Sequence, residues 1–287
     1  MPEYVYAVSQ LLALGRPDTF TADDWPDYRA LGLGPEHLPE LIRLATDPAL
    51  SRADPESAEA WAPVHARRAL GQLRAEAAGE PLLRLLDELD GEGYDEWTVE
   101  ELPEVYRLIG PAAVPLLAAY LANSAHGPFG RETAGTCLAE IGRAFPPVRA
   151  ACVAHLTRVL AGFAKNGPFL TALIVVPLLD LAARESLPVM EQAFKAGRVD
   201  LATVDWRFVQ KKLDLPGYRD DLRTDRPPQP SGKRAPERTR TLDWVRPPDR
   251  VRAPDQVRPP DKGKGQPKDR ARRTQAEQSR RQNRRRQ

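Results

Sequence analysis

Proline near the first turn of an amphipathic helix recurs five times in this chain, and this recurrence constrains the fold most strongly. A stripe of Leu and Val at helical spacing follows each proline, and the prolines are Pro39, Pro81, Pro115, Pro147 and Pro188. Successive prolines are 42, 34, 32 and 41 residues apart. Proline is tolerated at a helix start because the N–H that it lacks would have no partner there. Recurrence over this distance predicts stacked pairs of helices.

Glycines mark the end of the preceding helix at three of the five predicted pairs. Three of the proline-started helices follow shortly after another apolar helix that ends near glycine, at Gly71, Gly110 and Gly142. Between residues 3 and 215 no convincing run alternates apolar and polar residues at a period of two. The predicted fold class is therefore all-α, built from helix, tight turn and helix.

Two further helices are expected before the repeats begin. Residues 4–14 have an amphipathic pattern that Gly15 closes. Thr21 and Asp24 have the spacing of a capping pair, which predicts a helix through residues 25–31.

Residues 108–121, LIGPAAVPLLAAYL, closely resemble the HEAT-like repeats of the phycobilin lyase type found in many bacterial proteins. Residues 69–89 follow the same pattern, and the likeness extends over roughly residues 61–194. The resemblance implies a right-handed α-solenoid of about five helix pairs with a concave binding face. It implies no common chemistry, because the Leu, Ala and Gly positions of such a repeat are packing positions.

The helical pattern fails near residue 215, which predicts a repeat domain over residues 1–215 and a disordered tail over residues 216–287. The tail is rich in Pro, Arg, Asp, Gln and Gly. Its few apolar residues cannot offset a backbone entropy of roughly 1–2 kcal/mol per ordered residue. Residues 245–262 repeat the hexapeptide Val-Arg-x-Pro-Asp-x three times, which favours polyproline II segments and a semi-rigid spacer.

Charge is distributed unevenly between these two parts. The whole chain has 42 basic and 40 acidic residues, but residues 216–287 hold 22 of the basic and only 10 of the acidic ones. The tail is therefore basic by 12 charges and the repeat domain acidic by 10. The basic residues are densest in residues 268–287, whose clustered arginines are Arg272, Arg273, Arg280, Arg281, Arg284, Arg285 and Arg286.

Such an arginine cluster favours polyanions, since neutralising phosphates releases counterions. No aromatic residue is interleaved with these arginines for base stacking, which argues against selective binding of single strands. Contact with RNA or DNA, docking to an acidic protein or anionic surface, and a role in solubility are all open.

Acidic residues concentrate between the second and third predicted helix pairs. The candidate residues for binding a basic partner are Asp87, Glu88, Asp90, Glu92, Asp95 and Glu96. A calcium loop with Gly93 at its sixth position would need a glutamate at the twelfth, where Val99 stands. A solvated acidic loop before a helix and a docking surface for a basic partner, including this chain's own tail, remain as interpretations.

Three tryptophans stand near predicted helix starts, and they are either packing residues or anchors for a protein partner. These are Trp25, Trp61 and Trp97. The histidines and cysteines have no metal-binding or catalytic spacing, so we expect no metal and no cofactor. Cys137 and Cys152 lie in helical patterns and are expected to be buried, reduced thiols.

These features favour a non-enzymatic scaffold in a reducing cytoplasm. No stretch approaches the roughly 20 apolar residues that span a bilayer. In this hypothesis the solenoid binds a protein partner and the basic tail acts as an electrostatic tether that raises avidity. The alternative is a nucleic-acid-associated factor that binds through the arginine-rich tail. A HEAT-fold enzyme, such as a bilin lyase or a DNA glycosylase, is less favoured, because a glycosylase needs a basic face and this domain is acidic.

Overall fold

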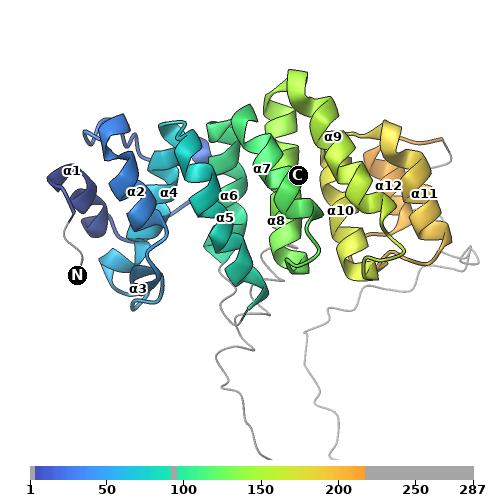
Figure 1. Ribbon diagram of the computed structural model, residues 1–287, viewed down its shortest axis with the longest axis horizontal. Helices are drawn as coiled ribbons and strands as arrows, with labels where there is room; N and C mark the ends of the chain where they lie inside the picture. Colours follow the sequence, from blue (N-terminus) through green and yellow to red (C-terminus); the bar gives the residue numbers. More distant parts are fainter. Residues whose placement is uncertain (1–3, 92–95, 217–287) are drawn as a thin grey trace, which may run out of the picture. The chain divides into compact units, whose positions relative to one another are not determined.

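Helices and no strands make up the part of the chain that the computed structural model describes, residues 4–91 and 96–216 (Figure 1). The chain divides into two units, Met1–Tyr218 and Arg219–Gln287, and every described helix belongs to the first. The all-α prediction is confirmed for these residues. The predicted disordered tail, with its hexapeptide repeats and its arginine-rich end, lies outside the described residues apart from Pro216.

All five proline-started helices predicted from the sequence are present, and they form one layer. This second layer consists of α2 (Leu38–Ala45), α5 (Gly79–Asp87), α7 (Val114–Ala122), α9 (Pro146–Ala161) and α11 (Leu187–Lys195). Each contacts the next along the layer. The prolines lie in the first turn, where no backbone N–H is lost from the helix.

The helices between them form the other layer. This first layer consists of α4 (Ala62–Gln72), α6 (Glu96–Ile109), α8 (Pro128–Ala144) and α10 (Pro168–Asp180). α8 illustrates the packing, because it contacts α6 and α10 in its own layer and α7 and α9 in the other. One second-layer helix stands between each two successive first-layer helices in the chain, so the first-layer helices run in the same direction and begin at the same edge.

Shorter elements complete the unit. They are α1 (Tyr6–Ser9), α3 (Pro48–Ser51) and α12 (Trp206–Lys212), with 3₁₀ turns η1 (Gln10–Ala13), η2 (Ala22–Asp24), η3 (Pro35–His37), η4 (Ala58–Trp61), η5 (Glu76–Ala78), η6 (Glu88–Asp90), η7 (Pro111–Ala113) and η8 (Arg184–Ser186). The helix expected over residues 4–14 is thus divided between α1 and η1, and Gly15 ends it with a φ of 73°.

The helix expected through residues 25–31 is wrong. Only the single turn η2 forms, and the Thr21 side chain makes no capping hydrogen bond. Trp25 has an extended backbone, with ψ of 147°. The reason is Pro26, since a residue before proline is sterically driven out of the helical region.

The glycines near the helix ends have two different tasks. Gly110 has a φ of 94° and lets the chain turn from α6 into α7. Gly142 lies inside α8, where a Cβ atom would come within 2.9 Å of the Leu181 side chain at the end of α10. Close packing rather than helix termination therefore explains Gly142. The buried residues form one continuous core from Tyr4 to Leu213.

Candidate binding face

The three tryptophans that the sequence singles out lie in one cluster, around the side chain of Arg68 on α4. The guanidinium carbon of Arg68 is 4.8 Å from the ring centre of Trp25 and 5.8 Å from that of Trp97. The rings of Trp61 and Trp97 meet edge to face with their centres 5.2 Å apart. Trp25 is buried, whereas Trp61 and Trp97 are half-buried. Only the latter two offer surface to a partner.

Arg68 is part of a buried ion pair that links the first two helices of the first layer. Its Nε donates a hydrogen bond of 2.8 Å to Glu101 on α6, and its Nη2 also contacts this carboxylate. The two side chains are 1% and 0% exposed. Arg67 makes a parallel link through a 2.6 Å bond to the Thr98 hydroxyl. Packing and buried charge together therefore join α4 to α6.

Residues 15–34, here called the strap, lie against α4 without forming a long helix. Side chains one turn apart on α4 hold the strap by its backbone. His65 Nε2 is 2.8 Å from the Gly15 carbonyl, Arg68 Nη2 is 2.5 Å from the Thr19 carbonyl, and Gln72 Nε2 is 2.9 Å from the Pro26 carbonyl. Three side chains on one face of α4 thus bind the strap through its backbone carbonyl groups.

The strap also fixes the protonation of His65. A carbonyl can only accept, so Nε2 carries the proton toward Gly15, and Nδ1 accepts from the Tyr28 hydroxyl at 2.7 Å. Burial lowers the pKa of His65, the bond to Gly15 opposes this shift, and the positive charge of Arg68 lowers the pKa further. The neutral ring is therefore the form that this site holds.

We expect the strap to make the domain less stable in acid. Folded His65 binds a proton less readily than the unfolded chain, so the unfolded state takes up more protons as the pH falls below about 6.5. Its stabilising contribution is complete above that pH and is lost as the pH falls toward the lowered pKa. Urea unfolding at pH 7.5 and 5.5 should show a smaller loss for His65→Gln than for the wild type. An equal loss would contradict the assignment.

The acidic residues expected to bind a basic partner have structural partners of their own. Asp90 accepts hydrogen bonds from the backbone N–H groups of Phe129 at 2.9 Å and Gly130 at 3.0 Å, so it caps the start of α8. Asp87 accepts from the Tyr120 hydroxyl at 2.7 Å and lies 2.8 Å from His126 Nδ1. Asp87 and Asp90 therefore join the end of α5 to α7 and α8, and both residues are also exposed.

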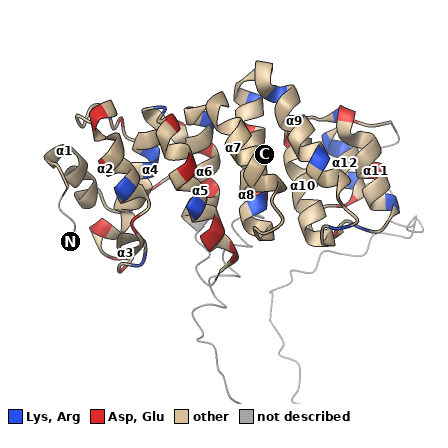
Figure 2. Ribbon diagram, viewed as in Figure 1, with Lys and Arg blue, Asp and Glu red and all other residues tan. Residues whose placement is uncertain are grey.

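Figure 2 shows acidic residues, coloured red, at the end of α5 and in the turn that follows it. Glu88 is exposed there. Glu92 and Asp95 lie outside the described residues, as does the side chain of Glu96 at the first residue of α6. Within residues 4–91 and 96–216, no group of three or more His, Cys, Asp or Glu side chains could hold a metal ion.

An aromatic residue stands at the start of every first-layer helix, a regularity that the sequence interpretation missed beyond its tryptophans. This aromatic row consists of Trp61, Trp97, Phe129 and Phe169, beside or within the first turns of α4, α6, α8 and α10. The rings of Phe129 and Phe169 meet edge to face at 5.6 Å. Residues 127–129 and 167–169 are both Gly-Pro-Phe, and this 40-residue repeat could have identified the row.

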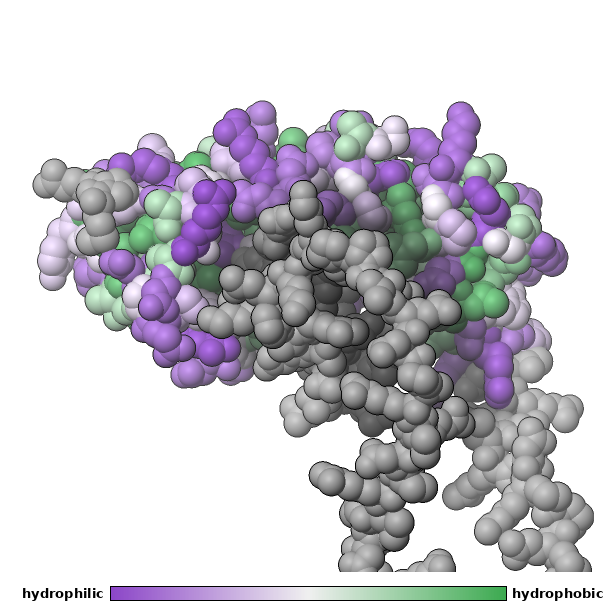
Figure 3. Space-filling view, turned by 90° about the horizontal axis from the view of Figure 1, so that it is seen from below, coloured by the Kyte–Doolittle hydropathy of each residue, from purple (hydrophilic) through white to green (hydrophobic). Residues whose placement is uncertain are grey.

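Part of the aromatic row is open to solvent. Phe169 is 38% exposed, and Phe129 is half-buried. Leu201 and Phe208, which follow α10 in the chain, are exposed as well. Figure 3 shows apolar residues among hydrophilic ones on the face of the molecule seen from below. Exposed aromatic surface beside polar groups is typical of contact sites for proteins.

Carboxylates from three successive helices approach one another further along the first layer. Burial raises the pKa of Glu140 on α8, Arg143 opposes this shift, and the negative charges of Glu104 on α6 and Asp180 on α10 raise the pKa further. Arg143 pairs with Glu140 at 2.8 Å, and Arg107 pairs with Glu104 at 2.7 Å. Carboxylates of α6, α8 and α10 therefore lie near one another, and those of Glu104 and Glu140 pair with arginines of their own helices.

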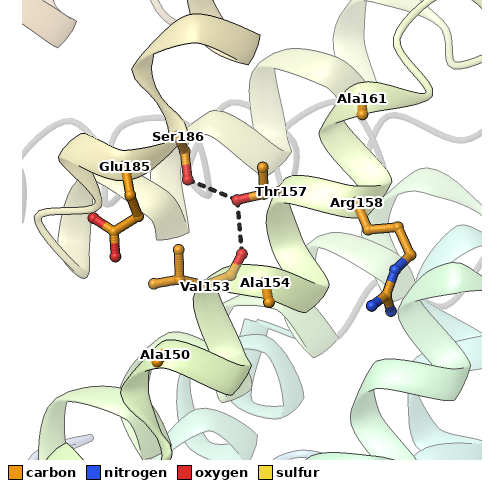
Figure 4. A pocket seen from close by; sticks show the side chains of 8 residues that line it. All are labelled: Ala150, Val153, Ala154, Thr157, Arg158, Ala161, Glu185 and Ser186. Atoms are coloured by element: carbon orange, nitrogen blue, oxygen red, sulfur yellow. Dashed lines mark hydrogen bonds between the residues drawn. The ribbon is translucent and has the colours of Figure 1, made fainter.

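A shallow hollow of about 460 Å³ lies in the second layer, between α9 and the start of α11 (Figure 4). Small side chains from α9 line much of it, with Thr157, Arg158, Glu185 and Ser186. The Thr157 and Ser186 hydroxyls hydrogen-bond to each other at 2.6 Å, and Thr157 also donates to the Val153 carbonyl. Both hydroxyls therefore take part in hydrogen bonds within the protein, and the bond between them joins α9 to η8.

Both cysteines are buried and form no disulfide, as expected. Burial raises the pKa of each thiol, so neither is a ready nucleophile. No single described helix is both long and apolar enough to cross a membrane. Among the described helices, one pair reaches this length and composition, α6 with α7, and the two are bent by 112°.

The predicted polyanion-binding arginines between Arg272 and Arg286 all lie outside the described residues. The structure thus brings the three candidate tryptophans together and gives Asp87 and Asp90 structural bonds. No family model, curated protein or solved structure compared with the chain matches it.

Proposed function

We propose that this protein is a non-enzymatic interaction scaffold. Its helix pairs stack as a right-handed α-solenoid of the HEAT-like type, the first layer faces a protein partner, and the basic tail tethers that partner electrostatically. The partner binds to the aromatic row, which includes Trp61 and Trp97. It also binds to the exposed carboxylates of Asp87 and Glu88.

The aromatic row is the observation that carries this proposal. Each first-layer helix contributes one aromatic residue at the same edge, and Phe169 remains 38% exposed. Half-buried aromatic residues are enriched at protein interfaces because they bury large areas with little loss of conformational entropy. The strap supports the same view, since the first layer already holds one irregular segment of the chain by its backbone.

A second candidate function rests on the arginines of residues 268–287. Their clustered charge favours RNA or DNA through phosphate contacts that do not depend on base sequence. The repeat domain would then be an acidic body carried by a nucleic-acid-binding tail. The two functions are tested by different measurements, a protein cross-link for the first and retention of RNA for the second.

Photo-crosslinking in cells tests the scaffold. A benzoylphenylalanine at Phe169 should give an adduct with one defined protein, and the same protein should be captured from Val176 on the same helix. The matched control is Ala154, an exposed residue on the second-layer helix α9.

Capture of the same proteins from Ala154, or of none from Phe169, would count against a binding face on the first layer. Retention of RNA by the full-length protein at 0.15 M salt, lost when the seven arginines are replaced by glutamine, would support the second candidate instead. The protein adduct at Phe169 does not require that retention.

A further inference from the structure

Within residues 4–91 and 96–216, the large apolar side chains that are exposed lie only near the two ends of the helical unit. They are Val5, Tyr6 and Leu14 near its start, and Phe169, Leu201 and Phe208 near its end. Stacked helix pairs cover one another, and a terminal pair normally has a polar outer face because no neighbour covers it. Both ends of this unit expose apolar side chains instead.

The first end, residues 4–14, is held in place although its apolar side chains point outward. The N–H of Val5 donates a 2.9 Å hydrogen bond to Glu40 on α2, and the Tyr4 hydroxyl donates a 3.3 Å bond to Asp47. Tyr6 is nevertheless 82% exposed and Val5 46% exposed. A partner can bury side chains on such a fixed backbone with little further ordering of the chain.

The last end consists of α12 and the loop that precedes it. Trp206 at the start of α12 meets Phe194 of α11 edge to face, with ring centres 5.3 Å apart. Leu201 in the loop is 66% exposed, and Phe208 on α12 is 37% exposed. Figure 1 shows α1 at one end of the two layers and α11 with α12 at the other. The two apolar surfaces are therefore separate.

The two ends differ in charge. Residues 4–61, which precede α4, hold ten acidic and four basic residues. Helix α12 holds three basic residues and no acidic one, and Arg207, Lys211 and Lys212 are all exposed. Lys212 Nζ lies 5.7 Å from the ring centre of Phe208, so positive charge borders the apolar surface. A contact between two like ends would oppose like charges, whereas a contact between unlike ends pairs opposite charges.

We propose that a second copy of this chain docks head to tail, with Leu201 and α12 of one copy against residues 5–14 of the next. Such a contact joins two different surfaces, so each pair keeps one free end of each kind and further copies can add. The elements involved are short, which places the contact among the weak and reversible ones. Each added copy brings its own basic tail, so assembly would raise avidity for a polyanion or acidic partner.

Sedimentation velocity of the purified full-length protein, free of nucleic acid, tests this proposal between about 1 and 500 μM, the range in which weak contacts form. The sedimentation coefficient of the wild type should rise with concentration. Val5→Ser/Tyr6→Ser changes only the first end and Leu201→Ser/Phe208→Ser only the last, so each should lose the rise. Their circular dichroism should match the wild type, because the changed side chains are exposed.

The matched control is Ala151→Ser/Ala154→Ser, two exposed positions on α9 away from both ends. This variant should associate like the wild type.

Mixing the two end variants distinguishes head-to-tail contact from a symmetric dimer. Each variant keeps one intact end, and the two intact ends are complementary. An equimolar mixture should therefore form pairs of two chains and no larger species. In a symmetric dimer, by contrast, the variant of the uninvolved end would still dimerise alone and mixing would form nothing new.

Four results would overturn the proposal. They are a wild type that stays a single chain at every concentration, association that survives in both end variants, association that survives in only one of them, and a mixture that forms no pairs. Survival in both variants would assign the association to the basic tail and the acidic domain. These samples contain no partner protein, so their outcome does not decide whether Phe169 cross-links to a different protein in cells.

Discussion

Replacing Arg68 by methionine should destabilise the protein by about 3–5 kcal/mol, the usual cost of removing one member of a buried ion pair. The change leaves the Glu101 carboxylate at 0% exposure without the guanidinium that bonds to it. It also removes the bond to the Thr19 carbonyl and the cation beside Trp25. Urea unfolding followed by circular dichroism would measure the loss.

The double variant Arg68→Met/Glu101→Leu separates the charge from the packing. Because it removes both members of the pair, it should recover most of the stability that the single variant loses. Arg84→Met on the exposed face of α5 is the matched control, with an expected change within about 0.5 kcal/mol. If Arg68→Met costs no more than Arg84→Met, the pair does not join α4 to α6 as described.

Gly130→Ala should destabilise the protein by about 1–3 kcal/mol, although alanine is the better helix former. A methyl group on Gly130 would lie 2.6 Å from the Tyr120 hydroxyl oxygen and 2.7 Å from the Leu86 carbonyl oxygen. The Leu86 carbonyl belongs to the backbone of α5, so α5 and α8 must move apart. That movement would strain the bonds from Tyr120 to Asp87 and from Gly130 to Asp90.

Gly167→Ala is the control for this substitution. Gly167 has a φ of −65°, and a Cβ atom there meets nothing within 4 Å. Its melting temperature should stay close to that of the wild type, while Gly130→Ala should melt several degrees lower. Similar melting temperatures for the two variants would show that α5 and α8 do not approach so closely.

Local chemistry explains which parts of the fold could be predicted. The five proline-started helices followed from the sequence because proline at a first turn and a Leu stripe both act within one helix. The helix through residues 25–31 was wrong for an equally local reason. Pro26 opposes helix at Trp25 more strongly than the Thr21 and Asp24 pair favours it.

The remaining features depend on residues far apart in the chain. Arg68 lies one turn after His65 on α4, but its ion-pair partner is 33 residues away on α6. Asp90 looked like part of a solvated loop because the helix that it caps begins 38 residues later, at Pro128. The second half of the aromatic row was different, since the repeated Gly-Pro-Phe was visible in the sequence.

That repeated Gly-Pro-Phe also bears on how the number of helices could change during evolution. Residues 127–166 contain α8 and α9 and are followed at once by a second Gly-Pro-Phe at the start of α10. Unequal recombination between the two copies would delete or duplicate this 40-residue unit in frame. The joined chain would begin its next helix with the same aromatic residue. Lineages carrying this gene could thus lengthen or shorten the protein by whole units while the strap and the end of the domain stay unchanged.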